Sequence, residues 1–145
     1  RAIVVGLRPV DLSGDGLHTA LRKQVELLDR VHDARVTFDG EPVDGLCASQ
    51  QEALYRIAQE AMHNALRHAE AKQIDITLRT DKDVVVLEVV DNGRGFDTDT
   101  PREAQSAHRL GIGSMRERAR ALGGRLLVSS AKGAGTTVRV EMPTC

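Results

Sequence analysis

An acidic residue followed by glycines stands at Asp91-Asn-Gly-Arg-Gly-Phe96, directly after the apolar run Val84–Val90. The run predicts a buried strand, so the carboxylate of Asp91 is delivered at a strand end. Gly93 and Gly95 lack side chains, which lets the backbone close on a flat ligand. A carboxylate beside such a backbone suits a nitrogenous ring, whose amino group donates to it. The same residues also occur in ordinary turns, so the motif is informative only together with its neighbours.

Glu60, Asn64 and His68 recur every four residues within a predicted helix. Residues four apart share a helix face, so these three form a polar stripe beside the apolar side. Asn64 offers an uncharged oxygen that suits Mg²⁺, and Glu60 can hold a metal-bound water or act as a base. Arg67, on the next turn, can meet a phosphate. A solvated polar edge of the helix is the alternative interpretation.

A second glycine-rich stretch is Leu110-Gly-Ile-Gly-Ser-Met115. Ser114 and Glu117 have capping-box spacing, so we expect a helix to begin at Ser114. A helix N-terminus presents unpaired N–H groups, which attract phosphate, and Gly111 and Gly113 stand beside it. A flexible loop with a good N-cap is the alternative. The polar stretch before it has no periodicity, and we expect residues 97–113 to be a lid that orders over bound ligand.

A third glycine-containing stretch, Gly133-Ala-Gly-Thr-Thr137, leads into a predicted strand. Thr136 shares a face with the apolar residues of that strand, so it is expected to point inward. A buried hydroxyl requires a hydrogen-bond partner, for which the carboxylate of Asp91, or a water that it holds, is the candidate. A simple hairpin leading to an edge strand is the alternative.

Hydrophobic periodicity supplies the elements that position these residues. A capping-box pattern, Ser49 and Glu52, begins the longest helix. The two hairpin-like strand pairs favour antiparallel neighbours and a two-layer α/β sandwich, with a mixed, mostly antiparallel sheet covered by about three helices on one face. The predicted helices cover about residues 16–31, 49–70 and 114–122, and the predicted strands cover 34–39, 73–79, 84–90, 125–129 and 136–142.

The composition narrows the possible functions. The chain has 145 residues, a net charge of −1 and no Trp, so a basic face with stacking aromatics is absent and direct nucleic-acid binding has little support. Cys47 and Cys145 are too few for a disulfide framework or a metal cluster, which is typical of a reducing cytosol. Because the chain begins at Arg1 without Met, we expect it to be a fragment excised from a longer protein. We expect this fragment to be a cytoplasmic domain, and the longer protein could be anchored in the membrane.

In this order the motifs resemble those of the ATP-binding catalytic domains of two-component sensor histidine kinases, in the GHKL (Bergerat-fold) superfamily with gyrase, Hsp90 and MutL ATPases. The segment Glu60–His68 is similar to the N box of that family. The three glycine boxes are matched by Asp91–Phe96, Gly111–Met115 and Gly135–Thr136. The resemblance covers residues 7–143. It implies a catalytic domain over residues 10–145, preceded at 1–9 by the end of a linker.

Finer features resemble the nitrate/nitrite-sensor-like subfamily, whose kinases pair with response regulators that carry a helix-turn-helix output domain. These features are Leu7-Arg-Pro9, Tyr55–Ala61 and Met115–Ala119. An anti-sigma-factor serine kinase has the same nucleotide fold without a dimerisation hairpin, but the Leu-Arg-Pro linker argues against it. A domain that binds nucleotide only to gate a partner is a further alternative. A gyrase- or Hsp90-like ATPase is less favoured, because a transducer domain is lacking.

The resemblance also implies ligands and roles. ATP and Mg²⁺ are the expected ligands, Asn64 is the expected metal ligand, and Glu60 is the catalytic base unless an acid beside the acceptor histidine, outside this chain, takes that role. Ser114 stands where the family usually has glycine, which weakens the expectation of a phosphate contact there. The expected nucleotide contacts are Arg67, His68, Asp91, Gly93, Gly95, Gly111, Gly113, Ser114 and Thr136.

The implied reaction moves the γ-phosphoryl group of ATP to a histidine on a dimerisation domain, and then to an aspartate of a response regulator. His32-Asp33 matches a histidine–acid pair only superficially, because it lies at the end of a predicted helix. We therefore expect the phosphoacceptor upstream of this fragment, which would bind ATP without phosphorylating itself. The full-length protein is expected to be a homodimer.

Overall fold

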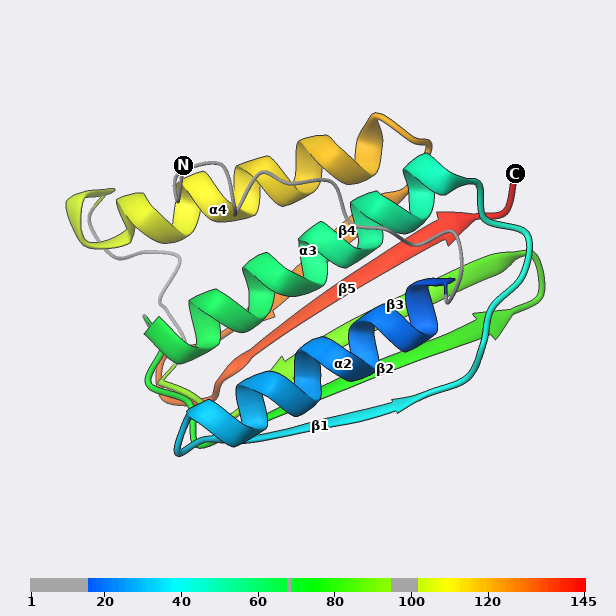
Figure 1. Ribbon diagram of the computed structural model, residues 1–145. Coiled ribbons are helices and arrows are strands. Elements are labelled where there is room, and N and C mark those ends of the chain that lie inside the picture. Colours follow the sequence, from blue (N-terminus) through cyan, green and yellow to red (C-terminus); the bar gives the residue numbers. More distant parts are fainter. Residues whose placement is uncertain (1–15, 68, 95–101) are drawn as a thin grey trace, which may run out of the picture.

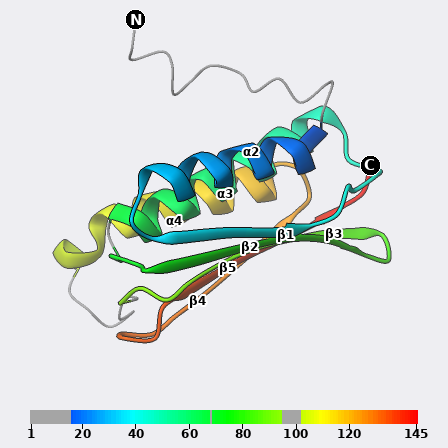
Figure 2. The same cartoon turned by 60° about the horizontal axis from the view of Figure 1, so that its bottom comes forward.

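The computed structural model describes residues 16–67, 69–94 and 102–145, and for 102–110 it describes the backbone alone. In these parts of the chain, three helices lie side by side on one face of a five-stranded sheet (Figures 1 and 2). In the described part of the chain, no helix combines the length and apolar character needed to cross a membrane. The elements are α2 (Gly16–Val31), β1 (Arg35–Gly40), α3 (Ala48–Arg67), β2 (Gln73–Asp81), β3 (Val84–Asp91), α4 (Arg102–Arg120), β4 (Arg125–Ser130) and β5 (Thr136–Pro143).

The five strands are ordered β1-β2-β3-β5-β4. The β1–β2 pair is parallel, and the other three pairs are antiparallel. The predicted two-layer α/β sandwich with a mixed, mostly antiparallel sheet is therefore confirmed. Because β5 lies between β3 and β4, Thr136 is placed directly opposite Asp91. This pairing brings the first and third glycine-containing stretches together.

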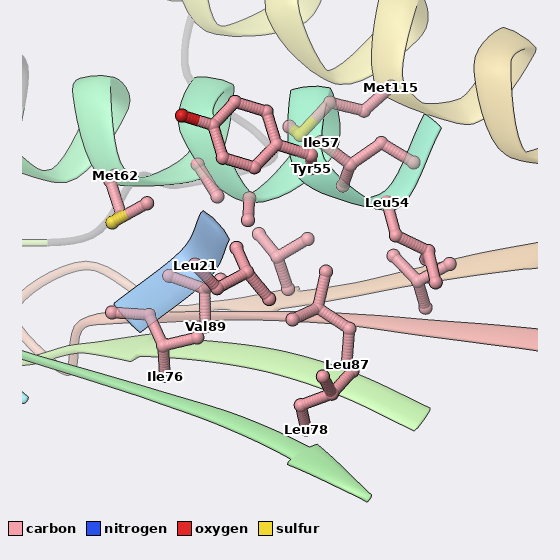
Figure 3. Packing of buried hydrophobic residues seen from close by; sticks show 14 of the residues in the cluster. Leu21, Leu54, Tyr55, Ile57, Met62, Ile76, Leu78, Leu87, Val89 and Met115 are labelled. Atoms are coloured by element: carbon pink, nitrogen blue, oxygen red, sulfur yellow. The ribbon is translucent and has the colours of Figure 1, made fainter. Parts of the chain in front are cut away.

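The core lies between the helices and the inner face of the sheet (Figure 3). β2 alternates, so that it buries Ile74, Ile76 and Leu78 in the same core as the apolar stripe of α3. Tyr55 is the aromatic residue among the core residues labelled in Figure 3. Its hydroxyl donates to Gln24 Oε1 of α2 at 3.2 Å. Burial raises the pKa of Tyr55 above its ordinary value, so this hydroxyl keeps its proton.

The outer face of the sheet is more polar. Arg139 of β5 lies between Glu88 and Glu141, with nitrogen–oxygen distances of 3.2 and 2.9 Å. Hydrogen bonds to Glu141 and Glu88 raise the pKa of Arg139 above its ordinary value. Because these side chains are partly exposed, the ion pairs contribute little net stability.

The start of α3 differs from the prediction. The helix begins at Ala48. Cys47 is its N-cap residue, because Cys47 O accepts the first hydrogen bond of the helix, from Gln51 N–H at 3.0 Å. Gln50 reaches back, and its Oε1 accepts from Cys47 N–H at 3.2 Å. This is the reciprocal half of a capping box, with Gln50 in the role that the sequence pattern assigned to Glu52. Ser49 is therefore inside the helix rather than its cap.

The start of α4 also differs. The helix begins at Arg102 and includes Gly111, Gly113 and Ser114, whereas the capping-box spacing predicted a start at Ser114. Much of the segment predicted to be an irregular lid is thus helical. The predicted end of this helix, at about Leu122, is close to its observed end at Arg120. Gly124 N–H donates to Ala119 O at 2.8 Å and Gly123 has a φ of 81°, which is the geometry of a glycine-terminated helix.

A disulfide bond joins Cys47 to Cys145, a pairing that was not predicted from two cysteines 98 residues apart. It links the residue before α3 to the C-terminal end of the chain, and backbone and side-chain hydrogen bonds also join the two regions. Cys145 N–H donates to Gly45 O at 2.7 Å, and Gln50 Nε2 donates to Pro143 O at 2.8 Å. These hydrogen bonds join the same two segments as the disulfide does.

We predict that reducing this disulfide destabilises the domain without unfolding it. The crosslink closes a loop of 98 residues. A loop of that size is worth up to about 4.7 kcal/mol in the chain-entropy account, or roughly 5–15 °C in Tm. Thermal unfolding with and without dithiothreitol measures the change. A Cys47→Ser variant is the control and should not respond to the reductant; an equal response in both proteins would contradict the prediction.

Candidate functional site

A pocket lies between the inner face of the sheet, α3 and α4. The empty space between its walls, including its mouth, is about 380 Å³. Asn64, Asp91 and Thr136, which are far apart in the sequence, all line it. The remaining walls are small or apolar side chains, namely Ala61, Ala65, Ala69, Val89, Ile112, Met115, Val128 and Val138. The structure therefore brings a carboxylate, an amide and a hydroxyl to one largely apolar cavity.

Asp91, the last residue of β3, is held in one orientation. Its residue surface is 8% exposed, and Oδ1 accepts a hydrogen bond from Gly93 N–H at 2.8 Å. The following Asn92 is fixed by its own side chain, whose Oδ1 accepts from the N–H groups of Lys72 and Gln73 at 2.9 and 2.8 Å. Hydrogen bonds thus hold the turn after β3 against the segment at the start of β2, which keeps the Asp91 carboxylate at the pocket wall.

Gly93 fits where no other residue would. A Cβ there would lie 2.5 Å from Ala69 Cβ, 2.6 Å from Ala69 O and 2.9 Å from Asp91 Oδ1. Those distances are well inside van der Waals contact, so any side chain would push Ala69 or Asp91 aside. The glycine thus serves close packing between the end of α3 and the end of β3. Gly95 lies outside the described residues.

Gly135 makes the closest approach in the site. Its φ is 80°, and a Cβ there would overlap the carbonyl oxygen of Asp91. This glycine therefore allows β5 to pass against the backbone of β3 immediately before Thr136. Gly133, two residues earlier, has nearly the same φ of 81° but faces open space.

Thr136 points inward, as its strand alternation predicts, but its partner is not the predicted one. Its Oγ1 lies 2.8 Å from Ser130 Oγ at the end of β4. Asp91 is the cross-strand neighbour on the other side, yet the hydroxyl hydrogen bond is made to Ser130. The hairpin of β4 and β5 was predicted, but its register, which places Ser130 opposite Thr136, was not.

The polar stripe of α3 meets α4. A Cβ at Gly111 would lie 3.0 Å from Glu60 Oε2 and 3.3 Å from Asn64 Nδ2, so α4 passes close to both side chains. Glu60 also borders a second, more open hollow between α3 and α4, together with Ser114. Arg67 is exposed at the last turn of α3, and His68 lies outside the described residues.

The predicted phosphate-binding helix N-terminus is not present at Ser114. Within an α-helix, N–H groups beyond the first four donate to carbonyls of the preceding turn. Gly111, Gly113 and Ser114 lie well inside α4, so their N–H groups are used in this way. A Cβ at Gly113 would meet nothing within 4 Å. The predicted helix start at Ser114 is therefore wrong, and the phosphate contacts of these residues stay a prediction.

The residues present fit a cation held jointly with phosphate more readily than a protein-only metal site. Among the described residues, no group of three or more His, Cys, Asp or Glu side chains is placed to hold a metal ion. Asn64 and Glu60, one helical turn apart, supply one amide and one carboxylate. Mg²⁺ in nucleotide sites takes few protein oxygens and completes its shell with water and phosphate, which suits such a sparse donor set.

Sequence reasoning missed two contributions to the pocket. Ala61, Ala65 and Ala69 were recognised as apolar residues, but their small size at four-residue spacing is also what leaves room beside α3. Ile112, between the two glycines of α4, contributes an apolar wall. The first signal was available in the sequence, whereas the second depends on where α4 lies.

Comparisons with known proteins agree with this geometry. Residues 49–145 match the family described as histidine kinase-, DNA gyrase B-, and HSP90-like ATPase, and the chain belongs to that family. It is similar to the sensor histidine kinase LiaS of Bacillus subtilis, with 33% identity over 99% of this chain and 38% of LiaS. It is also similar to the signal transduction histidine-protein kinase/phosphatase DegS of the same organism, with 36% identity over 94% of this chain and 36% of DegS.

Two solved structures share the fold. The histidine kinase domain of the Erythrobacter litoralis EL346 blue-light activated histidine kinase superposes with a TM-score of 0.70, at 23% identity, over 88% of this chain and 61% of that one. The ATP binding domain of PrrB from Mycobacterium tuberculosis gives 0.64, at 20% identity, over 89% and 94%. The chain is thus an ATPase domain of the sensor histidine kinase type, and it spans about two-fifths of the length of the curated relatives.

We predict that Gly135→Ala damages the site far more than Gly133→Ala. Both positions have φ near 80°, so both pay about 1–2 kcal/mol for a left-handed conformation. Only Gly135→Ala also drives a methyl group into the Asp91 carbonyl, which should cost a further 1–3 kcal/mol or so. Chemical unfolding measures both variants. Equal destabilisation would show that the close approach of β5 to β3 is unimportant.

Proposed function

We propose that this chain is the ATP-binding catalytic domain of a sensor histidine kinase, and that it delivers the γ-phosphoryl group of ATP to a histidine on a dimerisation domain of the parent protein. An aspartate on a response regulator would then receive the phosphoryl group. The observation that carries the proposal is the buried Asp91, oriented at the wall of an apolar pocket that Asn64 also lines. The similarity to sensor histidine kinases favours this function over a serine kinase or a purely regulatory module.

The pocket is suited to the adenine ring. Val89, Met115 and Val138 offer apolar surface to the faces and edge of a flat ring, and burying that surface drives binding. The carboxylate of Asp91 would accept from the exocyclic amino group. Because Gly93 N–H already occupies Oδ1, the carboxylate cannot rotate freely to follow other ligands. Thr136 would complete the contact with the same edge of the base.

Asn64 and Glu60 would act on the phosphates. Asn64 would hold Mg²⁺, which neutralises charge on the phosphates when it is bound. Glu60, one turn earlier, would hold a metal-bound water or act as a base, unless an acid beside the acceptor histidine has that role. Positioning and charge neutralisation supply most of the catalysis in phosphoryl transfer.

The remaining contacts require α4 to rearrange. Arg67 would approach phosphate, His68 would line the ribose or adenine, and Gly95 would give the ring room. Gly113 and Ser114 would contact phosphate together with Gly111, which requires the first turns of α4 to open, since their N–H groups are engaged within the helix in the arrangement described here. Residues 97–113 would then form the lid over the nucleotide.

The proposal extends to the parent protein. Residues 1–9 would be the end of a linker from a dimerisation and phosphoacceptor helix, and residues 10–145 the catalytic domain of a nitrate/nitrite-sensor-like kinase. The parent would be a homodimer with its catalytic domain in the cytoplasm and an anchor in the membrane. His32 follows α2, is exposed and lies at the end of a helix, which fits a polar terminus rather than a phosphoacceptor.

We predict that Asp91→Asn weakens ATP binding by about 10- to 100-fold, because an amide donor would face the donor of adenine. Isothermal titration of the fragment with ATP measures the change. Asp81→Asn, at an exposed carboxylate at the end of β2, is the matched control and should bind as the wild type does. Wild-type affinity in the Asp91 variant would refute the adenine assignment.

We predict that Asn64→Ala leaves ATP binding in EDTA nearly unchanged but removes the gain in affinity on adding Mg²⁺. In the parent protein it should also abolish phosphoryl transfer, while the wild type acquires an acid-labile phosphate, as expected for phosphohistidine. Gln59→Ala, on the same helix, is the control. Transfer that survives in the Asn64 variant would remove the metal role, and an acid-stable phosphate on the wild type would indicate a serine kinase.

A further inference from the structure

Ser130 stands directly behind Thr136. It is the last residue of β4, and the register of β4 and β5 pairs it with Thr136, which in turn pairs with Asp91 of β3. Three oxygen-bearing side chains therefore follow one another across three neighbouring strands. Thr136 and Asp91 line the pocket, whereas Ser130 does not. Ser130 Oγ lies 2.8 Å from Thr136 Oγ1 and 3.2 Å from Gly135 O.

These two contacts are compatible with one arrangement of protons. A backbone carbonyl can only accept, so Ser130 is the donor in its contact with Gly135 O, whereas either hydroxyl can donate in the contact with Thr136. When the single proton of Ser130 points at Gly135 O, the proton between the two hydroxyls comes from Thr136. With its proton directed at Ser130, Thr136 Oγ1 presents lone pairs elsewhere, including toward the pocket that it lines.

We propose that Ser130 is a positioning residue that fixes the hydroxyl of Thr136 as a hydrogen-bond acceptor, and that it thereby makes the pocket selective for a purine with an amino group at position 6 over one with a carbonyl. This inference rests on the proposed function, in which the pocket holds the base of ATP. Thr136 and Asp91 then offer only acceptors to the edge of the base.

Without Ser130 the selectivity is expected to weaken. A threonine hydroxyl is able to donate or accept, and it rotates to suit its partner. The Ser130 hydrogen bond limits that freedom before the ligand arrives, because a Thr136 that donated to the 6-carbonyl of a hypoxanthine ring would require Ser130 to turn its proton from Gly135 O to Thr136, at the loss of the bond to Gly135 O. Losing one neutral hydrogen bond of this kind corresponds to about a three- to tenfold change in relative affinity.

The test compares the dissociation constants of ATP and ITP, two nucleotides that differ in the 6-amino and 6-oxo groups. The wild type should prefer ATP, and Ser130→Ala should reduce the ATP-to-ITP affinity ratio by about three- to tenfold. Ser130→Thr and Ser130→Val form a matched pair of equal shape, of which only the threonine variant should keep the wild-type ratio. Ser129→Ala, an exposed hydroxyl on the opposite face of β4, is the control and should change nothing.

A double-mutant cycle separates positioning from a general structural effect. If Ser130 acts through Thr136, then Ser130→Val in a Thr136→Val background should produce no further change in the affinity ratio. Equal weakening of ATP and ITP in the Ser130 variants, an unchanged ratio, or an additive effect in the double variant would each overturn the inference. A wild type that binds neither nucleotide would instead contradict the proposed function.

Discussion

The pocket depends on the close backbone approach of Gly135 to Asp91. β5 can lie beside β3 at that point only because Gly135 has no side chain and adopts a positive φ. The approach sets Thr136 opposite Asp91, and the hairpin to β4 then sets Ser130 opposite Thr136. A single missing Cβ therefore aligns three polar side chains that belong to three strands.

Small residues on the helical side have a complementary effect. The pocket wall on the side of α3 consists of the small side chains of Ala61, Ala65 and Ala69, which leave space for a ligand. The larger side chains of Ile57 and Met62 pack in the core. Gly93 closes against Ala69, so that the same alanine both leaves room for a ligand and supports the turn after β3. Binding and folding thus share residues, because the apolar walls of the pocket continue directly into the core.

α4 is the element whose local signals and observed structure disagree most. Ser114 and Glu117 have the spacing of a capping box, yet the helix continues to Arg102. Both arrangements satisfy local preferences, and they differ in what lies in the space beside Glu60 and Asn64. In the structure that space is bordered by Gly111 of α4; in the proposed complex it would hold phosphate and a metal ion.

The sequence alone determined α2, α3 and all five strands to within about three residues at each end, because each carries a periodic apolar pattern or, in β3, a continuous apolar run, whose energetic origin is burial. It also determined the residue types that line the pocket, since Asp91, Asn64 and Thr136 follow from motif spacing. Tertiary structure decided the strand order, the partner of Thr136, the cap supplied by Gln50, the Cys47–Cys145 crosslink and the start of α4. Each of those depends on contacts between segments distant in the chain, which local periodicity does not encode.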